Sequence, residues 1–109
     1  MKLVIAIVQD EDAVRLVGKL MDEGFSVTKL ATTGGFLRAG NTTLLVGVEE
    51  DKFDGAMHVI EKVCKSRKQI ATSPTPAAGA TGVYVPYPIE VMVGGATVFV
   101  LNVEQFIKM

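Results

Sequence analysis

The first apolar run of the chain, Leu3 to Val8, reads LVIAIV and decides the fold. It is continuously apolar and rich in β-branched residues, which predicts a buried strand. Leu44–Val48 and Val98–Leu101 have the same character. A sheet with helices on one face only should alternate apolar and polar residues, because its second face meets water. These strands do not alternate, so a further layer must cover the second face.

A helix is predicted directly after the first strand. Asp10 is a candidate N-cap, and the acidic Glu11 and Asp12 suit the positive end of a helix dipole. Gly24 is placed to end the helix in a left-handed turn. The apolar residues that recur at helical spacing between these ends are Val14, Val17, Leu20 and Met21.

The middle of the chain repeats the order of strand and helix. Phe25–Leu30 alternates with period two and predicts a strand, whereas the Gly-rich Ala31–Gly40 predicts a loop. Thr42–Val48 is a second β-branched strand, and Asp51 begins a second helix. The predicted buried stripe of that helix consists of Phe53, Met57, Ile60 and Cys64.

The segment Ser66–Pro88 contains all four prolines and both tyrosines, and it predicts a long loop. Ile89–Val93 and Thr97–Val103 are predicted strands, and Gly94-Gly95 between them is a two-residue hairpin signal. A short amphipathic tail, Glu104–Met109, ends the sequence.

This order of elements predicts one domain over residues 1–109, an α+β sandwich of the ferredoxin-like type. It has a βαββαβ core and a C-terminal strand hairpin. Another copy of the chain, in a closed ring or dimer, is the favoured cover for the second sheet face. The alternative is that Ser66–Pro88 folds back over that face.

Composition excludes several classes of protein. The 109 residues include 11 Lys and Arg against 12 Asp and Glu, a net charge of −1, whereas nucleic-acid binders usually carry a basic excess. No apolar run approaches the ~18 residues that a membrane helix needs. Acidic residues follow the first apolar run, where a signal peptide would have small residues. We therefore expect a cytoplasmic protein without a nucleic-acid or membrane partner.

Few residues are candidates for catalysis. The single histidine, His58, and the single cysteine, Cys64, both lie on the second predicted helix, and no His/Cys cluster indicates a metal site. Cys64 extends the apolar stripe and fits core packing. No nucleophile motif is present. The sequence predicts no catalytic residue, metal or cofactor, and a small ferredoxin-like enzyme that uses His58 or Asp54 is the alternative.

The segment Thr32–Thr42, TTGGFLRAGNT, is the best candidate for ligand binding. Its glycines allow backbone N–H groups to converge on an anion, and Arg38 adds a guanidinium that binds phosphate. Asn41 replaces the lysine of a P-loop and a strand follows instead of a helix, which excludes an NTPase P-loop. Phe36 is either a plug into the core or a platform on which a planar base stacks. The combination fits a purine nucleotide.

Tyr84 and Tyr87 lie in the predicted long loop beside prolines. Such residues suit contact with a partner protein, or they fasten the loop to the body. An interaction module that works through the two tyrosines is therefore a further reading, and the sequence does not identify its target.

Several segments resemble known signalling proteins. Gly95–Glu104, GATVFVLNVE, resembles the C-terminal segment of PII signal-transduction proteins. Lys29–Thr43, KLATTGGFLRAGNTT, is similar to the signature of the PII-like cyclic di-AMP receptor family of Gram-positive bacteria. Three further segments also look like that family: Ala6–Asp10, Tyr87–Val91 and Gly94–Phe99. The resemblance implies a homotrimer of ferredoxin-like subunits that binds cyclic di-AMP between subunits. Such a protein is a second-messenger receptor that signals by loop rearrangement and performs no catalysis.

The resemblance also implies the ligand contacts. Phe36 and Phe99 are the expected apolar contacts, and Thr28, Gly35 and Asn41 are the main polar ones. The full set is Thr28, Gly35, Phe36, Leu37, Asn41, Gly47 and Phe99, to which the phosphate chemistry of Arg38 adds one more. PII proteins carry their long loop between the second and third strands, whereas this chain has it after the second helix. This departure counts against ATP and 2-oxoglutarate binding and against the usual PII targets. A PII-type sensor of ATP or ADP is the alternative function, and the sequence does not identify a downstream target.

Overall fold

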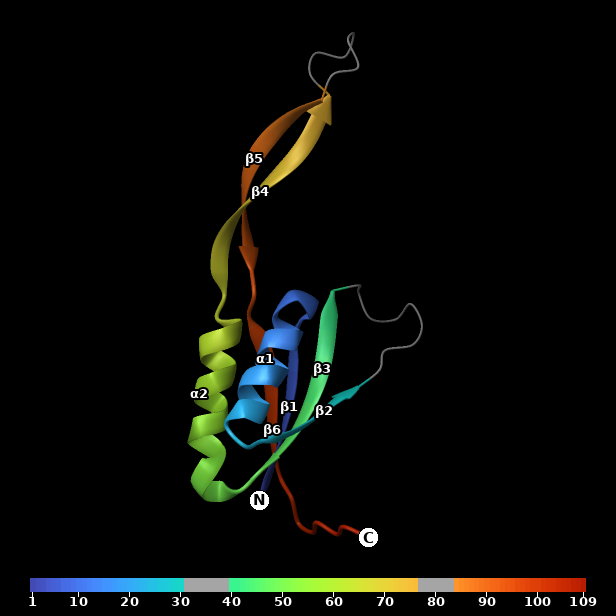
Figure 1. The fold of residues 1–109 in the computed structure, drawn as a ribbon, viewed down its shortest axis with the longest axis vertical. Helices are drawn as coiled ribbons and strands as arrows, with labels where there is room; N and C mark the ends of the chain where they lie inside the picture. Colours follow the sequence, from blue (N-terminus) through green and yellow to red (C-terminus); the bar gives the residue numbers. More distant parts are fainter. Residues whose placement is uncertain (31–39, 77–83) are drawn as a thin grey trace.

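The computed structural model describes residues 1–30, 40–76 and 84–109. Figure 1 shows the order of the elements, which are β1 (Lys2–Gln9), α1 (Asp10–Asp22), β2 (Ser26–Leu30), β3 (Asn41–Val48), the short 3₁₀ helix η1 (Glu50–Lys52), α2 (Phe53–Cys64), β4 (Arg67–Pro76), β5 (Tyr84–Val93) and β6 (Ala96–Asn102).

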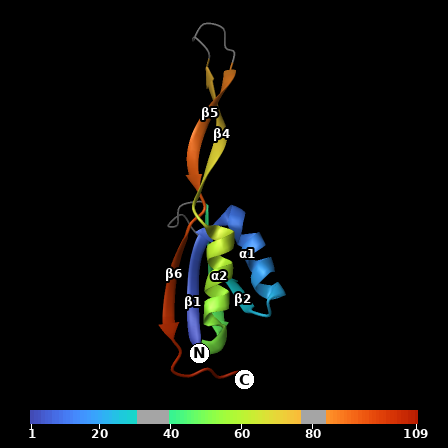
Figure 2. The same cartoon turned by 90° about the vertical axis from the view of Figure 1, so that its left-hand side faces the viewer.

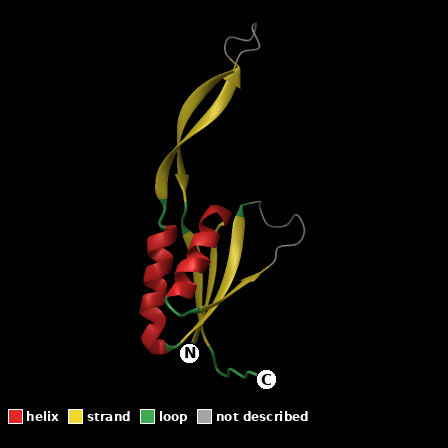
Figure 3. Cartoon of the chain, viewed as in Figure 1, coloured by secondary structure: helices red, strands yellow, loops and turns green. Residues whose placement is uncertain are grey.

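Four of the strands form one antiparallel sheet in the order β2-β3-β1-β6. Both helices lie on the same face of this sheet, as Figure 2 shows. The small α+β fold with two helices on an antiparallel sheet confirms the predicted class, and it is consistent with a ferredoxin-like sandwich. Figure 3 shows the same separation of a helical layer from a strand layer.

The core lies between this sheet and the helices. Alternate residues of β1, such as Val4 and Ala6, are fully buried under the helices. Leu16 and Leu20 of α1 and Ile60 of α2 meet them from the other side. The apolar strands predicted from the sequence therefore form the sheet side of the core, as expected from their apolar character.

The helix stripes differ from the prediction in detail. Val14 and Met21 of α1 are exposed, with exposed fractions of 78% and 61%. The buried side of α1 consists of Asp12, Ala13, Leu16 and Leu20. In α2, Ile60 and Cys64 are buried as predicted, while Phe53 and Met57 are only partly buried. The buried face of α1 lies one residue away from the predicted one, because apolar residues such as Ala13 and Leu16 stand directly beside the predicted Val14 and Val17.

The ends of the helices are also defined by the backbone. Gln9 is the N-cap of α1 and Asp10 is its first helical residue, so the prediction that Asp10 caps the helix is wrong. Gly24 has a φ of 89°, which confirms the left-handed turn after the helix. Asp51 lies within η1, two residues before α2 begins at Phe53.

The predicted loop Ser66–Pro88 is wrong. Its described residues form most of the antiparallel pair β4 and β5, in register from Arg67 opposite Val93 to Pro76 opposite Tyr84. The prolines hid this ribbon, because proline is usually a sign against a strand. In a two-stranded ribbon each strand is an edge, so a proline without an N–H is tolerated.

The predicted hairpin at Gly94-Gly95 is wrong as well. β5 pairs with β4, whereas β6 pairs with β1, so the two flanking strands belong to different sheets. Both glycines have positive φ, 83° and 89°, and they carry the chain from the ribbon into the main sheet. The ribbon projects beyond the end of the sheet in Figures 1 and 2, and its described strands do not fold back over the second face.

The thiol of Cys64 offers a test of this core. Burial, with a smaller contribution from Asp12, raises the pKa of Cys64 from 9.0 to about 11. Because the thiolate is the nucleophile, we expect almost no alkylation of the folded protein by iodoacetamide at pH 8. Mass spectrometry should show labelling only in denaturant. Rapid labelling of the folded protein would contradict the buried position of this residue.

Candidate ligand-binding site

The sheet face opposite the helices is called the open face. Residues on it alternate with the core residues along each strand, and the registers of the three strand pairs place them together. From β2 to β6 they are Ser26, Thr28, Leu30, Asn41, Thr43, Leu45, Gly47, Leu3, Ile5, Ile7, Gln9, Thr97, Phe99 and Leu101. No described element of the chain packs on this face (Figure 2).

The open face carries exposed apolar side chains. The exposed fractions of Phe99 and Leu101 are 54% and 50%, and Leu30 is also exposed. Contiguous apolar surface of this kind marks an interaction site. The apolar strand runs that predicted a further layer are therefore left uncovered within the described part of a single chain.

Four of the predicted ligand contacts lie on this face: Thr28, Asn41, Gly47 and Phe99. The other four, Gly35, Phe36, Leu37 and Arg38, lie outside the described residues. The structure therefore brings half of the predicted set onto one surface.

The four contacts are spread widely over that surface. A single row across the sheet runs from Thr28 through Leu45 and Ile5 to Phe99. Thr28 and Phe99 stand on the two edge strands, three strand spacings or about 14 Å apart. Asn41 and Gly47 are separated by most of the length of β3, about 20 Å. Within one chain these residues do not form a single small pocket.

Gly47 opens a notch in the face. It is exposed, and a Cβ built on it would meet no atom within 4 Å. Its register neighbours are Leu3 on β1 and Ser26 on β2. A flat ligand group can approach the backbone closely at this point, because no side chain occupies it.

A second hollow lies at the end of the face near Asn41. It has a volume of about 370 Å³ and is lined by residues of β1, β3, β6 and the Gly94-Gly95 link. Gln9, opposite Asn41 in the register, lines it and accepts a hydrogen bond from the N–H of Gly94 at 2.8 Å. The sequence analysis did not identify Gln9 as a site residue. Gln9 stands two residues after Ile7 on β1, and this spacing places both side chains on the same face of the sheet.

The beginning of α1 fixes the described end of the Gly-rich segment. The N–H of Asp10 donates to the carbonyl oxygen of Gly40 at 2.7 Å. The hydroxyl of Thr42 donates to the carboxylate of Asp10. Asn41 therefore sits between two residues that are held by the first turn of the helix.

The residues of the enzyme alternative lie elsewhere. His58 is exposed on α2 and lines a groove of about 420 Å³ between the two helices, with Arg15, Lys19 and Lys62 among its neighbours. This groove is on the helical side of the sheet, away from the open face. The described residues contain no group of three His, Cys, Asp or Glu side chains that could hold a metal ion. Among the described residues, no helix has the length and apolar character needed to cross a membrane.

The described residues form a small α+β protein in which both helices cover one face of the sheet and no described element covers the other. Residues 1–109 match the family model described as cyclic-di-AMP receptor. The chain belongs to the cyclic-di-AMP receptor family, which confirms the resemblance found in Lys29–Thr43.

A solved structure is similar over almost the whole length. It is the crystal structure of a functionally unknown protein from Pediococcus pentosaceus ATCC 25745, with 45% sequence identity and a TM-score of 0.76. The match covers 99% of this chain and 96% of that chain. The two chains therefore share their fold.

Proposed function

We propose that this protein is a receptor that binds cyclic di-AMP between copies of the chain and performs no catalysis. The observation that carries the proposal is the shared position of Thr28, Asn41, Gly47 and Phe99 on the open face. Membership in a family of cyclic-di-AMP receptors supports this choice of ligand.

The spread of the contacts supports a site between subunits. Thr28 and Phe99 are about 14 Å apart on opposite edge strands, and no described element covers the apolar surface between them. A neighbouring copy can bring its Phe99 edge to the Thr28 edge of the first, and repetition of this contact closes a ring. The resemblance implies that the ring is a homotrimer.

The chemistry of the contacts suits an adenine-bearing phosphodiester. The exposed ring of Phe99 offers an apolar face for a base, and Gly47 allows a base to approach the strand. The side chains of Thr28 and Asn41 offer hydroxyl and amide donors. By the resemblance Gly35, Phe36 and Leu37 complete the site, and Arg38 adds a cation for the phosphodiester.

Signalling would follow from a difference in the ligand's affinity for two conformations of the protein. A ligand shifts a conformational equilibrium only if it binds one conformation more tightly than the other. We propose that cyclic di-AMP favours one arrangement of the Gly-rich segment and thereby changes the surface that a partner protein meets.

A thermal-shift panel tests this function. Cyclic di-AMP at about 100-fold its dissociation constant should stabilise the protein by about 2.7 kcal/mol, which raises the melting temperature by about 10 °C. ATP and ADP at the same concentrations are the controls and should give a smaller shift. A shift with ATP and none with cyclic di-AMP would refute the proposal in favour of a PII-type nucleotide sensor.

A further inference from the structure

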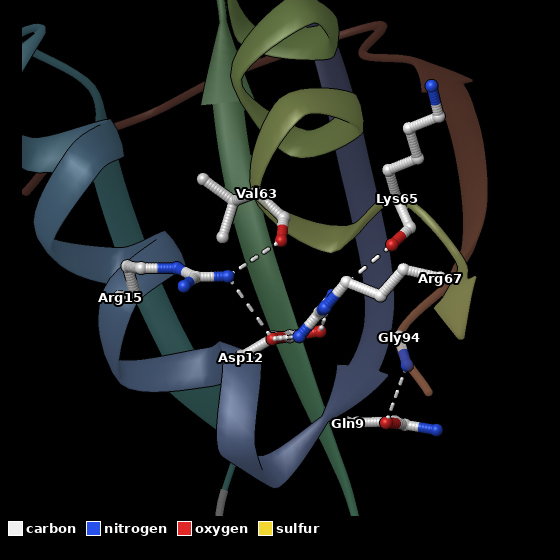
Figure 4. A network of polar contacts seen from close by, with 7 residues as sticks. All are labelled: Gln9, Asp12, Arg15, Val63, Lys65, Arg67 and Gly94. Atoms are coloured by element: carbon white, nitrogen blue, oxygen red, sulfur yellow. Dashed lines mark hydrogen bonds and ion pairs between the residues drawn. The ribbon is translucent and has the colours of Figure 1, made fainter. Parts of the chain in front are cut away.

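Asp12 is a buried charge near the start of α1. Its exposed fraction is 1%, yet its carboxylate accepts a hydrogen bond from Arg67 at 2.9 Å and lies 3.4 Å from Arg15, as Figure 4 shows. Arg15 also donates to the carbonyl oxygen of Val63 at 3.0 Å. A buried carboxylate is costly unless it is paired, so these two arginines hold Asp12 in place.

Arg67 is the first residue of β4, so this ion pair fixes one strand of the β4–β5 ribbon. Arg67 also donates to the carbonyl oxygen of Lys65 at 3.2 Å. The ribbon's other strand is fixed through Gly94, whose N–H donates to Gln9 at 2.8 Å. An isolated two-stranded ribbon has little stability of its own, so these contacts at its base set the direction in which it projects.

The same short segment, Gln9–Asp12, holds the edge of the open face. Asp10 binds Gly40 through its N–H and accepts a hydrogen bond from Thr42, on either side of Asn41. Asp10 and Asp12 both belong to the first turn of α1. The segment Gln9–Asp12 therefore connects Asn41, a predicted ligand contact, to both strands of the β4–β5 ribbon.

We propose that Asp12 is a positioning residue that acts through Arg67 to couple ligand occupancy of the open face to the direction of the β4–β5 ribbon. This inference rests on the proposed function. A ligand that displaces Asn41 displaces Gly40 and Thr42, and the first turn of α1 carries the movement to Asp12 and Arg67. Coupling between two sites is reciprocal, so a change at Arg67 must also alter the affinity for the ligand.

Hydrogen exchange with and without cyclic di-AMP tests this coupling. Arg67→Gln removes the ion pair with Asp12, while Arg15 still faces the carboxylate. Lys68→Gln is the matched control, because it removes only the exposed pair with Glu90 at 3.8 Å on the neighbouring position of β4. The readout is the exchange rate of peptides that cover 65–70 and 90–95, together with the melting temperature and the dissociation constant.

In the wild type and in Lys68→Gln, saturating ligand should slow exchange in both peptides. In Arg67→Gln the ligand should still bind, with an affinity changed by about fivefold or more, and the exchange rates should no longer respond. If Arg67 had a purely structural role, Arg67→Gln would change the melting temperature, but the exchange rates would still respond to the ligand. If Arg67→Gln does not fold, Arg67→Lys keeps the charge without the planar fork and should weaken the response.

The two proposals fail in different ways. If the wild type binds no cyclic di-AMP, the proposed function is wrong and the coupling falls with it. If the wild type binds the ligand but its ribbon shows no change in exchange rate, the coupling alone is wrong. The same holds if the wild type binds the ligand and the exchange rates of Arg67→Gln or Arg67→Lys respond as those of the wild type do.

Discussion

Replacement of Gly47 by valine is expected to remove most of the binding of cyclic di-AMP while the protein folds normally. A Cβ at this position meets nothing within 4 Å, and β-branched residues fit strands well. Loss of the flexible glycine should even stabilise β3, by on the order of 0.5–1 kcal/mol. The new side chain stands on the open face, where it occupies the notch that we assign to the ligand.

The loss of binding should correspond to about 1–3 kcal/mol, the usual cost of forcing extra methyl groups into an occupied space. This is about 5- to 150-fold in the dissociation constant, which a titration of the purified variant measures. Gly18→Ala is the matched control, because its Cβ also meets nothing within 4 Å but stands on α1. It should bind like the wild type. Unchanged affinity in Gly47→Val would show that the ligand does not approach this part of the face.

Gly94→Ala is expected to destabilise the protein more than Gly95→Ala does. Both glycines have positive φ, so an alanine at either position costs about 1–3 kcal/mol in backbone strain. At Gly94 the new Cβ would also lie 2.6 Å from Nη1 of Arg67 and 2.8 Å from the carbonyl oxygen of Lys65. At Gly95 it would meet nothing within 4 Å.

Urea unfolding of the two variants measures the difference. We expect Gly94→Ala to lose a further 1–3 kcal/mol, about the cost of overpacking. The pair is well matched, because the strain is common to both variants and only the steric contact differs. Equal losses would mean that Arg67 and Lys65 do not pack against Gly94 as the structure shows.

The main sheet could be predicted from the sequence because its strands are unbroken β-branched runs. Leu3–Val8 and Thr42–Val48 fall within β1 and β3, and both predicted helices are present. The β4–β5 ribbon was missed because its four prolines oppose a strand reading, and only the pairing of two edge strands makes them acceptable. That pairing is a property of the two consecutive strands together, and the local pattern of either strand alone does not reveal it.

The site could be predicted only in part. The resemblance supplied Thr28, Asn41, Gly47 and Phe99, and the strand registers then showed that they share one face. The contact of Gln9 with Gly94 joins residues 85 positions apart. The pair of Asp12 with Arg67 spans 55 positions. The sequence indicated Asp12 only as a helix-dipole residue, because nothing local shows that Arg67 returns to it.

Titration calorimetry with cyclic di-AMP tests the central claim most directly, because it reports affinity and stoichiometry together. For a site shared between neighbouring copies in a closed ring, saturation should occur at one ligand for each chain. Absence of binding heat from folded protein across several temperatures would contradict the account.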